Sequence, residues 1–333
     1  MHPHSRFRTV AYATSRELLD DTCALRLLEE FFDNHHFILA FAHLGLSKTT
    51  KEAKSDAAHD DSNELVAVAI FEENEAVGIA YATDETRVHI SRCKGKNPKA
   101  VVFGLAAEVM KSMRDLGTAF GPPKEVETFA HFLRESLGLS LERGLTCLSY
   151  SLTEVKMPER KLPAKALPGT LQLADRNDVA TVAEFYAKFL IDVKLSDKEM
   201  PMKSAAKWAA KEIERGAIFL WTVNSQLGGE LVDSTSSTTT VVSMVSIRGG
   251  GKNFVRIGMV FTPKRYRRCG YASNAVAALC RHALEGKLEN HEGIKRIVLL
   301  ADEENNSSRG IYESIGFVNS HSRHTHIRFI KKA

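Results

Sequence analysis

The stretch VFTPKRYRRCGYA, residues 260–272, is the most informative part of this chain. A strand-like apolar run ends at Thr262 and Pro263, a basic loop follows, and an apolar pattern at helical spacing begins near Tyr271. The first N–H groups of a helix have no partner within the helix, and the helix dipole adds partial positive charge there. Because Gly270 allows close approach to the backbone, this strand–loop–helix unit predicts a site for an anion such as a phosphate.

The loop also concentrates positive charge, which is supplied by Lys264, Arg265, Arg267 and Arg268. Arginine can bind phosphate through two parallel hydrogen bonds, which supports the anion site. A solvated basic turn is the alternative interpretation of the same residues. Cys269 lies beside Gly270, where a thiol can become nucleophilic, but we interpret it as a loop residue.

The bulk composition is that of an ordinary globular protein, with 333 residues that suit two domains. A net charge of +4 is too small to indicate a nucleic-acid partner, and no apolar run is long enough to indicate a membrane partner. Five cysteines without a C-x-x-C pair indicate free thiols in a reducing compartment. We therefore expect a cytoplasmic protein, and a homodimer is compatible with the sequence. Arg6, Arg8 and Arg16 precede the first acidic residue, so a mitochondrial presequence is the alternative.

A proline-rich run at residues 155–170 separates the chain into two halves. We place an N-terminal domain at 1–155, a linker at 156–169 and a C-terminal domain at 170–333. Both halves show helices alternating with short strands, which is typical of an α/β (α+β) fold and suggests two copies of one unit.

Hydrophobic periodicity and turn residues predict the elements. In the N-terminal half we expect a helix from residue 15 to 32, a polar surface loop at 46–64 and a hairpin around EENE at 72–75. In the C-terminal half we expect strands at 254–261 and 294–301, helices at 271–286 and 307–314, and a terminal hairpin at 317–330.

Two blocks of this sequence resemble the GNAT N-acyltransferase superfamily. Arg267, Gly270 and Ala272 match its acyl-CoA signature, which is Arg or Gln, two residues, Gly, one residue, then Gly or Ala. The block IVLLADEENNSSRGIYESIGF, residues 297–317, resembles its later segment, in which a strand, a polar loop and a short helix with a tyrosine precede Gly-Phe. The resemblance implies two tandem GNAT-like domains with a degenerate N-terminal copy. Each would be a mixed, mostly antiparallel sheet with a central pair of splayed parallel strands and flanking helices.

The resemblance also implies a function: transfer of an acetyl group from acetyl-CoA to a primary amine of a small molecule or peptide, by direct attack through a tetrahedral intermediate. No metal is implied. The pyrophosphate would lie on the basic loop and the pantetheine between the splayed strands, where one backbone N–H would polarise the thioester carbonyl. Tyr312 would donate a proton to the leaving thiolate. The implied cofactor-binding residues are Met259, Val260, Phe261, Arg267, Arg268, Cys269, Gly270, Tyr271, Ala272, Ser273, Asn305 and Ser308.

The sequence departs from this family pattern at two points. Many members carry a glutamate base on the strand at 254–261, where this chain has only Arg256, so the base stays unassigned. The two options are that Asp302 acts through water or that the amine arrives largely neutral. Gly310 weakens the helix that carries Tyr312, and we expect that helix to fray without the cofactor. The alternative function is a catalytically weak module that senses acyl-CoA or docks a partner. Tyr312 would then only cover the core.

Two further patterns are expected to carry no chemistry. Arg92 and Gly95 of the N-terminal half echo the acyl-CoA signature, but Asn97 replaces its small final residue and no tyrosine follows, so we expect this half to be non-catalytic. His321, His324 and His326 lie close in sequence without a nearby cysteine or carboxylate. We expect a solvated or substrate-facing strand there and no metal.

Overall fold

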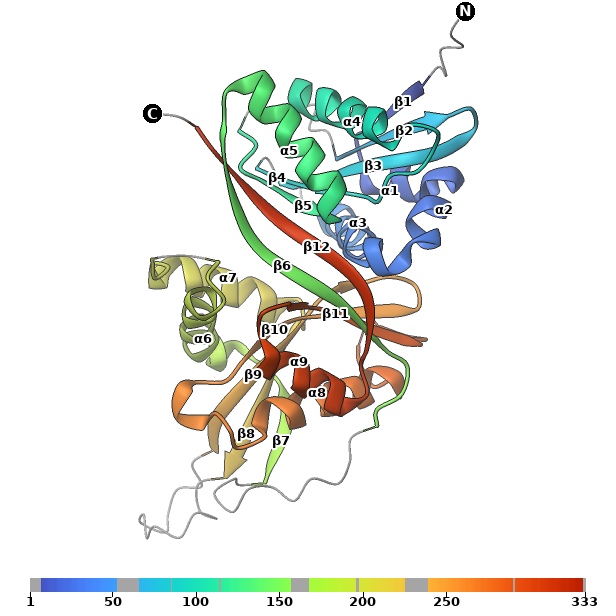
Figure 1. The fold of residues 1–333 in the computed structure, drawn as a ribbon. Coiled ribbons are helices and arrows are strands. Elements are labelled where there is room, and N and C mark those ends of the chain that lie inside the picture. The colour runs from blue at the N-terminus through green and yellow to red at the C-terminus, as the bar shows by residue number, and fades with distance from the viewer. Residues whose placement is uncertain are drawn as a thin grey trace, which may run out of the picture.

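The computed structural model describes residues 7–52, 66–84, 86–113, 115–156, 168–195, 198–224, 239–289 and 291–331 (Figure 1). Its strands are β1 (Phe7–Tyr12), β2 (Ala67–Glu72), β3 (Glu75–Asp84), β4 (Arg87–Ile90), β5 (Thr118–Gly121), β6 (Ser140–Leu152), β7 (Gly169–Leu173), β8 (Ile218–Asn224), β9 (Thr239–Gly250), β10 (Phe254–Phe261), β11 (Arg296–Asp302) and β12 (Val318–Ile330). Its α-helices are α1 (Ser15–Asp20), α2 (Thr22–Glu30), α3 (Phe32–Glu52), α4 (Pro98–Ser112), α5 (Pro123–Leu137), α6 (Val179–Asp192), α7 (Met202–Glu214), α8 (Tyr271–Leu284) and α9 (Asn306–Ile315). Short 3-10 turns are η1 (Arg176–Asp178) and η3 (Lys264–Tyr266).

Each half contributes antiparallel strands that lead to one parallel pair, β4 with β5 and β10 with β11. The parallel pairing of β10 with β11 extends over only three residue pairs, ending at Arg256 opposite Val298. Beyond this point the two strands no longer pair with each other, although β10 still pairs with β9 and β11 with β6. The register of β10 with β9 shifts between Val255 and Val260. Such an irregularity bends a strand. The predicted mixed sheet with a splayed parallel pair is therefore confirmed.

The two halves share a single sheet, with the strand order β1-β2-β3-β4-β5-β12-β6-β11-β10-β9-β8-β7. The last strand of each half has crossed to the other half. β12 pairs with β5, whereas β6 pairs with β11, and the two exchanged strands pair with each other along the middle of the molecule (Figure 1). The two sheets expected from the sequence are thus the two ends of one sheet.

Four hydrophobic clusters hold helices on the sheet. The cluster under α8 and α9 includes Leu148 and Tyr150 of β6, and the cluster under α4 and α5 includes Ile327 and Phe329 of β12. α1 to α3 enclose a third cluster, and α6 and α7 cover the fourth. Each half therefore relies on side chains from the other half's strand for its core.

Several elements differ from the sequence-based expectation. The predicted terminal hairpin is wrong: residues 318–330 form one strand, because its backbone pairs with β6 and β5 rather than with itself. The single helix expected at 15–32 is divided into α1 and α2, and the long helix α3 follows and extends into the expected surface loop. Most of that loop and the predicted linker lie outside the described residues, as does the extreme N-terminus.

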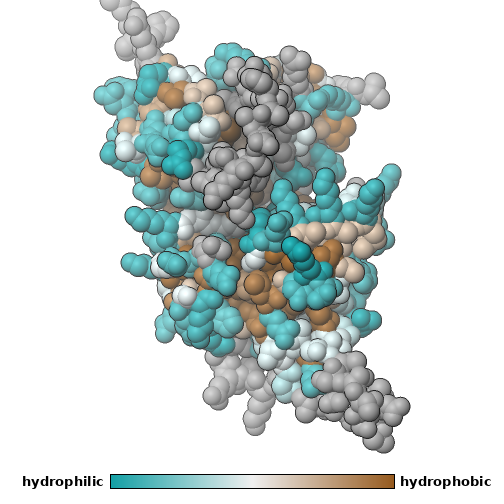
Figure 2. Space-filling model, turned by 180° about the vertical axis from the view of Figure 1, so that it is seen from behind, coloured by the Kyte–Doolittle hydropathy of each residue, from teal (hydrophilic) through white to brown (hydrophobic). Residues whose placement is uncertain are grey.

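Figure 2 shows the molecule from behind, where hydrophobic side chains gather over the lower, C-terminal half between polar margins. Among its exposed hydrophobic residues, that half carries Ile191, Leu195 and Met202 around the connection from α6 to α7. None of the described helices is long and apolar enough to cross a bilayer.

Candidate functional site: the basic loop between β10 and α8

The N-cap residue at the start of α8 has no side chain that could cap the helix. Gly270 is its N-cap residue, with φ +79°, and makes no side-chain capping hydrogen bond. Arg268 also has a positive φ, +64°, so left-handed residues alternate along this loop. By contrast, Asn97 caps α4 and Asn305 caps α9 through their side-chain oxygens. The N-terminus of α8 thus presents outward-pointing N–H groups and the positive end of the helix dipole.

Arg267 bridges this loop to α6. Its Nε donates to the carbonyl oxygen of Thr262 at 2.8 Å, and its Nη2 forms an ion pair with Asp192 at the end of α6. Its guanidinium also lies over the ring of Phe261, 5.9 Å from the centroid. The thiol of Cys269 points back to the Arg267 carbonyl at 3.7 Å, as a loop residue would. Arg267 is therefore held between the end of β10 and α6.

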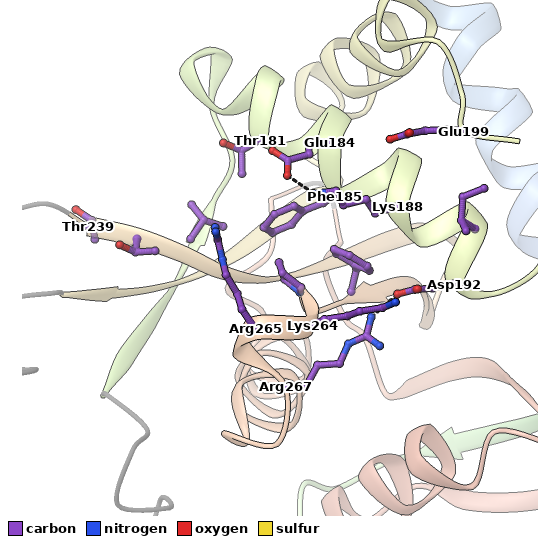
Figure 3. A pocket seen from close by; sticks show the side chains of 15 residues that line it. Thr181, Glu184, Phe185, Lys188, Asp192, Glu199, Thr239, Lys264, Arg265 and Arg267 are labelled. Atoms are coloured by element: carbon purple, nitrogen blue, oxygen red, sulfur yellow. Dashed lines mark hydrogen bonds and ion pairs between the residues drawn. The ribbon is translucent and has the colours of Figure 1, made fainter.

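A cavity of about 720 Å³ lies between α6 and this loop (Figure 3). Lys264, Arg265 and Arg267 line it from the loop, and Phe261 lines it from β10. Glu184, Lys188 and Asp192 line it from α6, as labelled in Figure 3. The cavity can hold a sizeable ligand with a negative group at the loop and apolar parts against the Phe261 ring.

Backbone groups at the end of β10 already have partners on β9. The N–H of Met259 donates to Ser246 Oγ at 2.9 Å, and the carbonyl of Phe261 accepts from Ser243 Oγ at 3.1 Å. A pantetheine arm laid along this strand would have to share or displace these serine hydroxyls. Neither serine was singled out by the sequence, since serine in a strand carries no motif of its own.

Tyr312 lies on α9 and is only 7% exposed. Its ring is 6.4 Å from that of Tyr150 and 5.9 Å from that of Phe317. Burial, and then the nearby Cys280 thiol, raises the pKa of Tyr312, so its hydroxyl keeps its proton at neutral pH. That proton is available for transfer, although a raised pKa also makes the donor a weaker acid.

Tyr150 of the exchanged strand β6 fixes α9 in place. Its hydroxyl donates to Glu313 Oε1 at 3.0 Å and accepts from Arg309 Nε at 3.2 Å. Asn305 caps the helix by accepting the Ser308 N–H at 3.0 Å. α9 is continuous through Gly310, so the expected fraying is not what the structure shows.

The remaining predicted residues are divided between the two helices. Tyr271 and Ser273 are buried in the first turn of α8, with Ala272 between them half-buried. Asp302, the optional base, lies at the end of β11, where its Oδ1 accepts the Glu304 N–H at 3.0 Å. The cavity itself brings together only Phe261 and Arg267 of the predicted set. Asp192 and Lys188 were missed, because they lie far from the loop in sequence.

Among the described residues, which include the three tail histidines, no group of three or more potential metal ligands lies together. The expectation of a solvated or substrate-facing strand is wrong for His324, which is fully buried beneath α3. One of its ring nitrogens, Nε2, faces the Asn34 carbonyl at 3.1 Å. β12 runs through the centre of the sheet, which explains its burial.

The corresponding loop of the N-terminal half is filled by its own carboxylates. The Lys96 N–H donates to Glu72 Oε2 at 3.0 Å, and the Cys93 N–H donates to Glu125 Oε1 at 3.3 Å. Asn97 caps the helix that follows. Two carboxylates thus accept hydrogen bonds from the N-terminal loop, whereas the N-cap residue of α8 in the C-terminal half is a glycine that makes no side-chain capping hydrogen bond.

Comparison with known proteins agrees with this architecture. The family model described as an acetyltransferase (GNAT) domain matches residues 162–318. Among solved structures, a GCN5-related N-acetyltransferase from Sphaerobacter thermophilus has a TM-score of 0.55 at 14% identity and covers 100% of this chain and 98% of its own. A Drosophila protein has a TM-score of 0.58 at 13% identity and covers 97% of this chain and 98% of its own. At these identities the likeness shows the fold. A search of curated proteins finds no match.

Proposed function

Since residues 162–318 belong to the GNAT acetyltransferase family, we propose that this protein transfers an acetyl group from acetyl-CoA to a primary amine. The observation that carries the proposal is the uncapped start of α8. Arg268 and Gly270 adopt left-handed conformations there, beside the exposed side chains of Lys264 and Arg265. Backbone N–H groups, helix dipole and basic side chains converge as a diphosphate requires.

In this proposal each part of the site has a role. The loop from Arg267 to Ser273 binds the pyrophosphate, and the separated ends of β10 and β11 receive the pantetheine, with Asn305 and Ser308 at the margin. Acetyl-CoA supplies an activated thioester, so the enzyme needs to orient the amine and stabilise negative charge on the carbonyl oxygen. The amine nitrogen adds to the thioester carbonyl carbon and forms a tetrahedral intermediate. Its collapse breaks the C–S bond, Tyr312 gives its proton to the sulfur, and the proton lost by the amine passes to solvent, from which Tyr312 is reprotonated.

The N-terminal half has a supporting role in this proposal. Its own loop cannot take a phosphate without displacing Glu72 and Glu125, so we assign acetyl-CoA binding to the C-terminal half alone. The N-terminal half instead supplies β6, whose Tyr150 holds α9, and α3, which packs against β9 and β10.

Acetyl-CoA should raise the melting temperature, because a ligand that binds only the folded state stabilises it by about 2.7 kcal/mol at a hundredfold excess over Kd. Arg267→Glu combined with Gly270→Asp should abolish that shift. Lys252→Glu with Asn253→Asp, at the opposite end of β10, makes the same change in charge and should retain it. A shift that persists in the first variant would place the cofactor elsewhere.

An acyl-CoA sensor without turnover is the second candidate, favoured by the occupied Met259 N–H and the buried Tyr312. Free thiol released from acetyl-CoA in the presence of a panel of amines distinguishes the two functions. Turnover that falls in Tyr312→Phe, with the acetyl-CoA melting shift unchanged, supports the enzyme. A melting shift without thiol release from any amine supports the sensor.

A further inference from the structure

Arg256 occupies an unusual position on β10. It is the last residue of that strand to pair with β11, opposite Val298, so it stands where the two parallel strands separate. Residues two apart on a strand share a face, and Phe254 and Arg256 both meet α3. The ring centroids of Phe254 and Phe32 are 5.0 Å apart, and the Arg256 guanidinium lies 5.2 Å from the ring centroid of Phe41.

The Arg256 guanidinium has no counterion among the residues that the structure describes. Within the described part of the chain it has neither a hydrogen bond nor an ion pair, and its Nε is buried without a partner. The side chain is only partly exposed. A buried charge without a partner is costly, and proteins usually pair one with a carboxylate or hydrogen-bond it fully.

The described groups around Arg256 do not neutralise its charge. Burial, together with neighbouring positive charges that include Arg256, lowers the pKa of His36 and takes that of His89 to about 3, so both rings are neutral at pH 7. Arg248 on β9 is positive and is itself paired with Glu212 at 3.4 Å. Burial, and then Arg248, lowers the pKa of Arg256 to about 9. Among the described residues, these aromatic rings, neutral imidazoles and a second arginine place no negative group beside Arg256.

Arg256 also lies close to the proposed reaction centre. It precedes Met259 by three residues on the same strand, which corresponds to about 10 Å of strand. Its position faces α3 at the junction of the two halves, whereas the phosphate loop begins beyond the other end of β10. A negative group held by Arg256 would therefore belong to the molecule that meets the thioester and not to the CoA phosphates.

We propose that Arg256 binds the carboxylate of the amine acceptor, so that the acceptor is an amino acid or a similar small molecule carrying both an amine and a carboxylate. This inference rests on the proposed function. Arginine suits the role because its guanidinium offers two parallel donors to a carboxylate. The bound carboxylate would supply the missing counterion and orient the amine toward the splayed strands.

The test compares L-amino acids with the amines left when their carboxylate is removed, such as alanine with ethylamine. The wild-type protein should prefer the amino acid in kcat/KM by about 10- to 100-fold, as expected for a charge-assisted hydrogen bond. Arg256→Met should bring the ratio close to one, and Arg256→Lys should retain part of it. Arg296→Met should keep the wild-type ratio, because Arg296 is exposed and also lies over a ring of α3, that of Phe32.

The outcomes separate this inference from the proposed function. Because Arg256→Met removes a partly buried charge that has no counterion among the described residues, its melting temperature without ligand should not fall, and the acetyl-CoA melting shift should match that of the wild type. An amino-acid preference that is absent, or unchanged in Arg256→Met, overturns the inference while leaving the acetyltransferase intact. If no amine is turned over, melting shifts with glycine and alanine decide: a shift lost in Arg256→Met supports the carboxylate site, and equal or absent shifts overturn it.

Discussion

At the scale of single residues, the site depends on how charge is matched. Arg267 is paired with Asp192 and held by the Thr262 carbonyl, so its direction is set before any ligand arrives. Arg256 has no such partner among the described residues. The two arginines lie on one strand–loop segment, yet only the first was recognisable from a motif. Arg256 was not recognisable in this way, because its surroundings are formed by α3 and β9. Which side chains of those elements lie near it cannot be read from the sequence.

Buried histidines give a residue-scale prediction about pH. Burial lowers the pKa of His324 to about 4 and that of His35 to about 3, whereas both titrate near 6.5 in the unfolded chain. Below pH 6.5 the unfolded state therefore binds more protons, and the free energy of unfolding falls as pH falls. Each histidine should lower the free energy of unfolding by about 1.4 kcal/mol when the pH falls from 7.5 to 5.5. Urea unfolding at the two pH values measures this loss, and His324→Gln should reduce it; an equal loss in that variant would contradict the assignment.

At the scale of elements, segments with a regular alternation of apolar and polar residues could be predicted. Helix α3, which is enclosed on several sides and lacks such alternation, could not. The strand, loop and helix at 254–284 follow from alternation, a proline and helical spacing, and the structure places them as expected. α3 was missed because it is packed on several sides, so its sequence FDNHHFILAFAHLG shows no clear polar face. β1 and β5 were missed because short strands carry little pattern.

α9 shows how a neighbouring element can override local propensity. Gly310 lowers the helix preference of this segment, but Tyr150 and the Asn305 cap hold the helix along its length. A Cβ added at Gly310 would meet nothing within 4 Å. Gly310→Ala should therefore raise the free energy of unfolding by about 0.5–1 kcal/mol, because alanine loses less backbone entropy on folding. Urea unfolding measures the gain, and a destabilised variant would show that glycine is needed there for another reason.

At the scale of the whole molecule, the exchange of β6 and β12 joins the halves. The sequences of β6 and β12 resemble those of ordinary strands. They contain no pattern that predicts which half of the molecule each strand pairs with. The exchange also explains why a boundary near residue 155 is a weak description of the molecule. The strand before that boundary completes the sheet of the second half, and the last strand of the chain completes the sheet of the first.

The exchange predicts that neither half folds alone. In a fragment of residues 1–156, both hydrogen-bonding edges of β6 would be unpaired, because its partners β11 and β12 are missing. The fragment would also lack Ile327 and Phe329 in the core under α4 and α5. A fragment of residues 168–333 would lack Leu148 and Tyr150. Both losses remove large buried apolar groups and leave long unpaired strand edges, which favour aggregation. Circular dichroism and size-exclusion chromatography should show each fragment unfolded or aggregated when expressed alone, and a stable one-to-one complex on co-expression. Two monomeric fragments that each unfold cooperatively would mean that the exchanged strands are dispensable for either core.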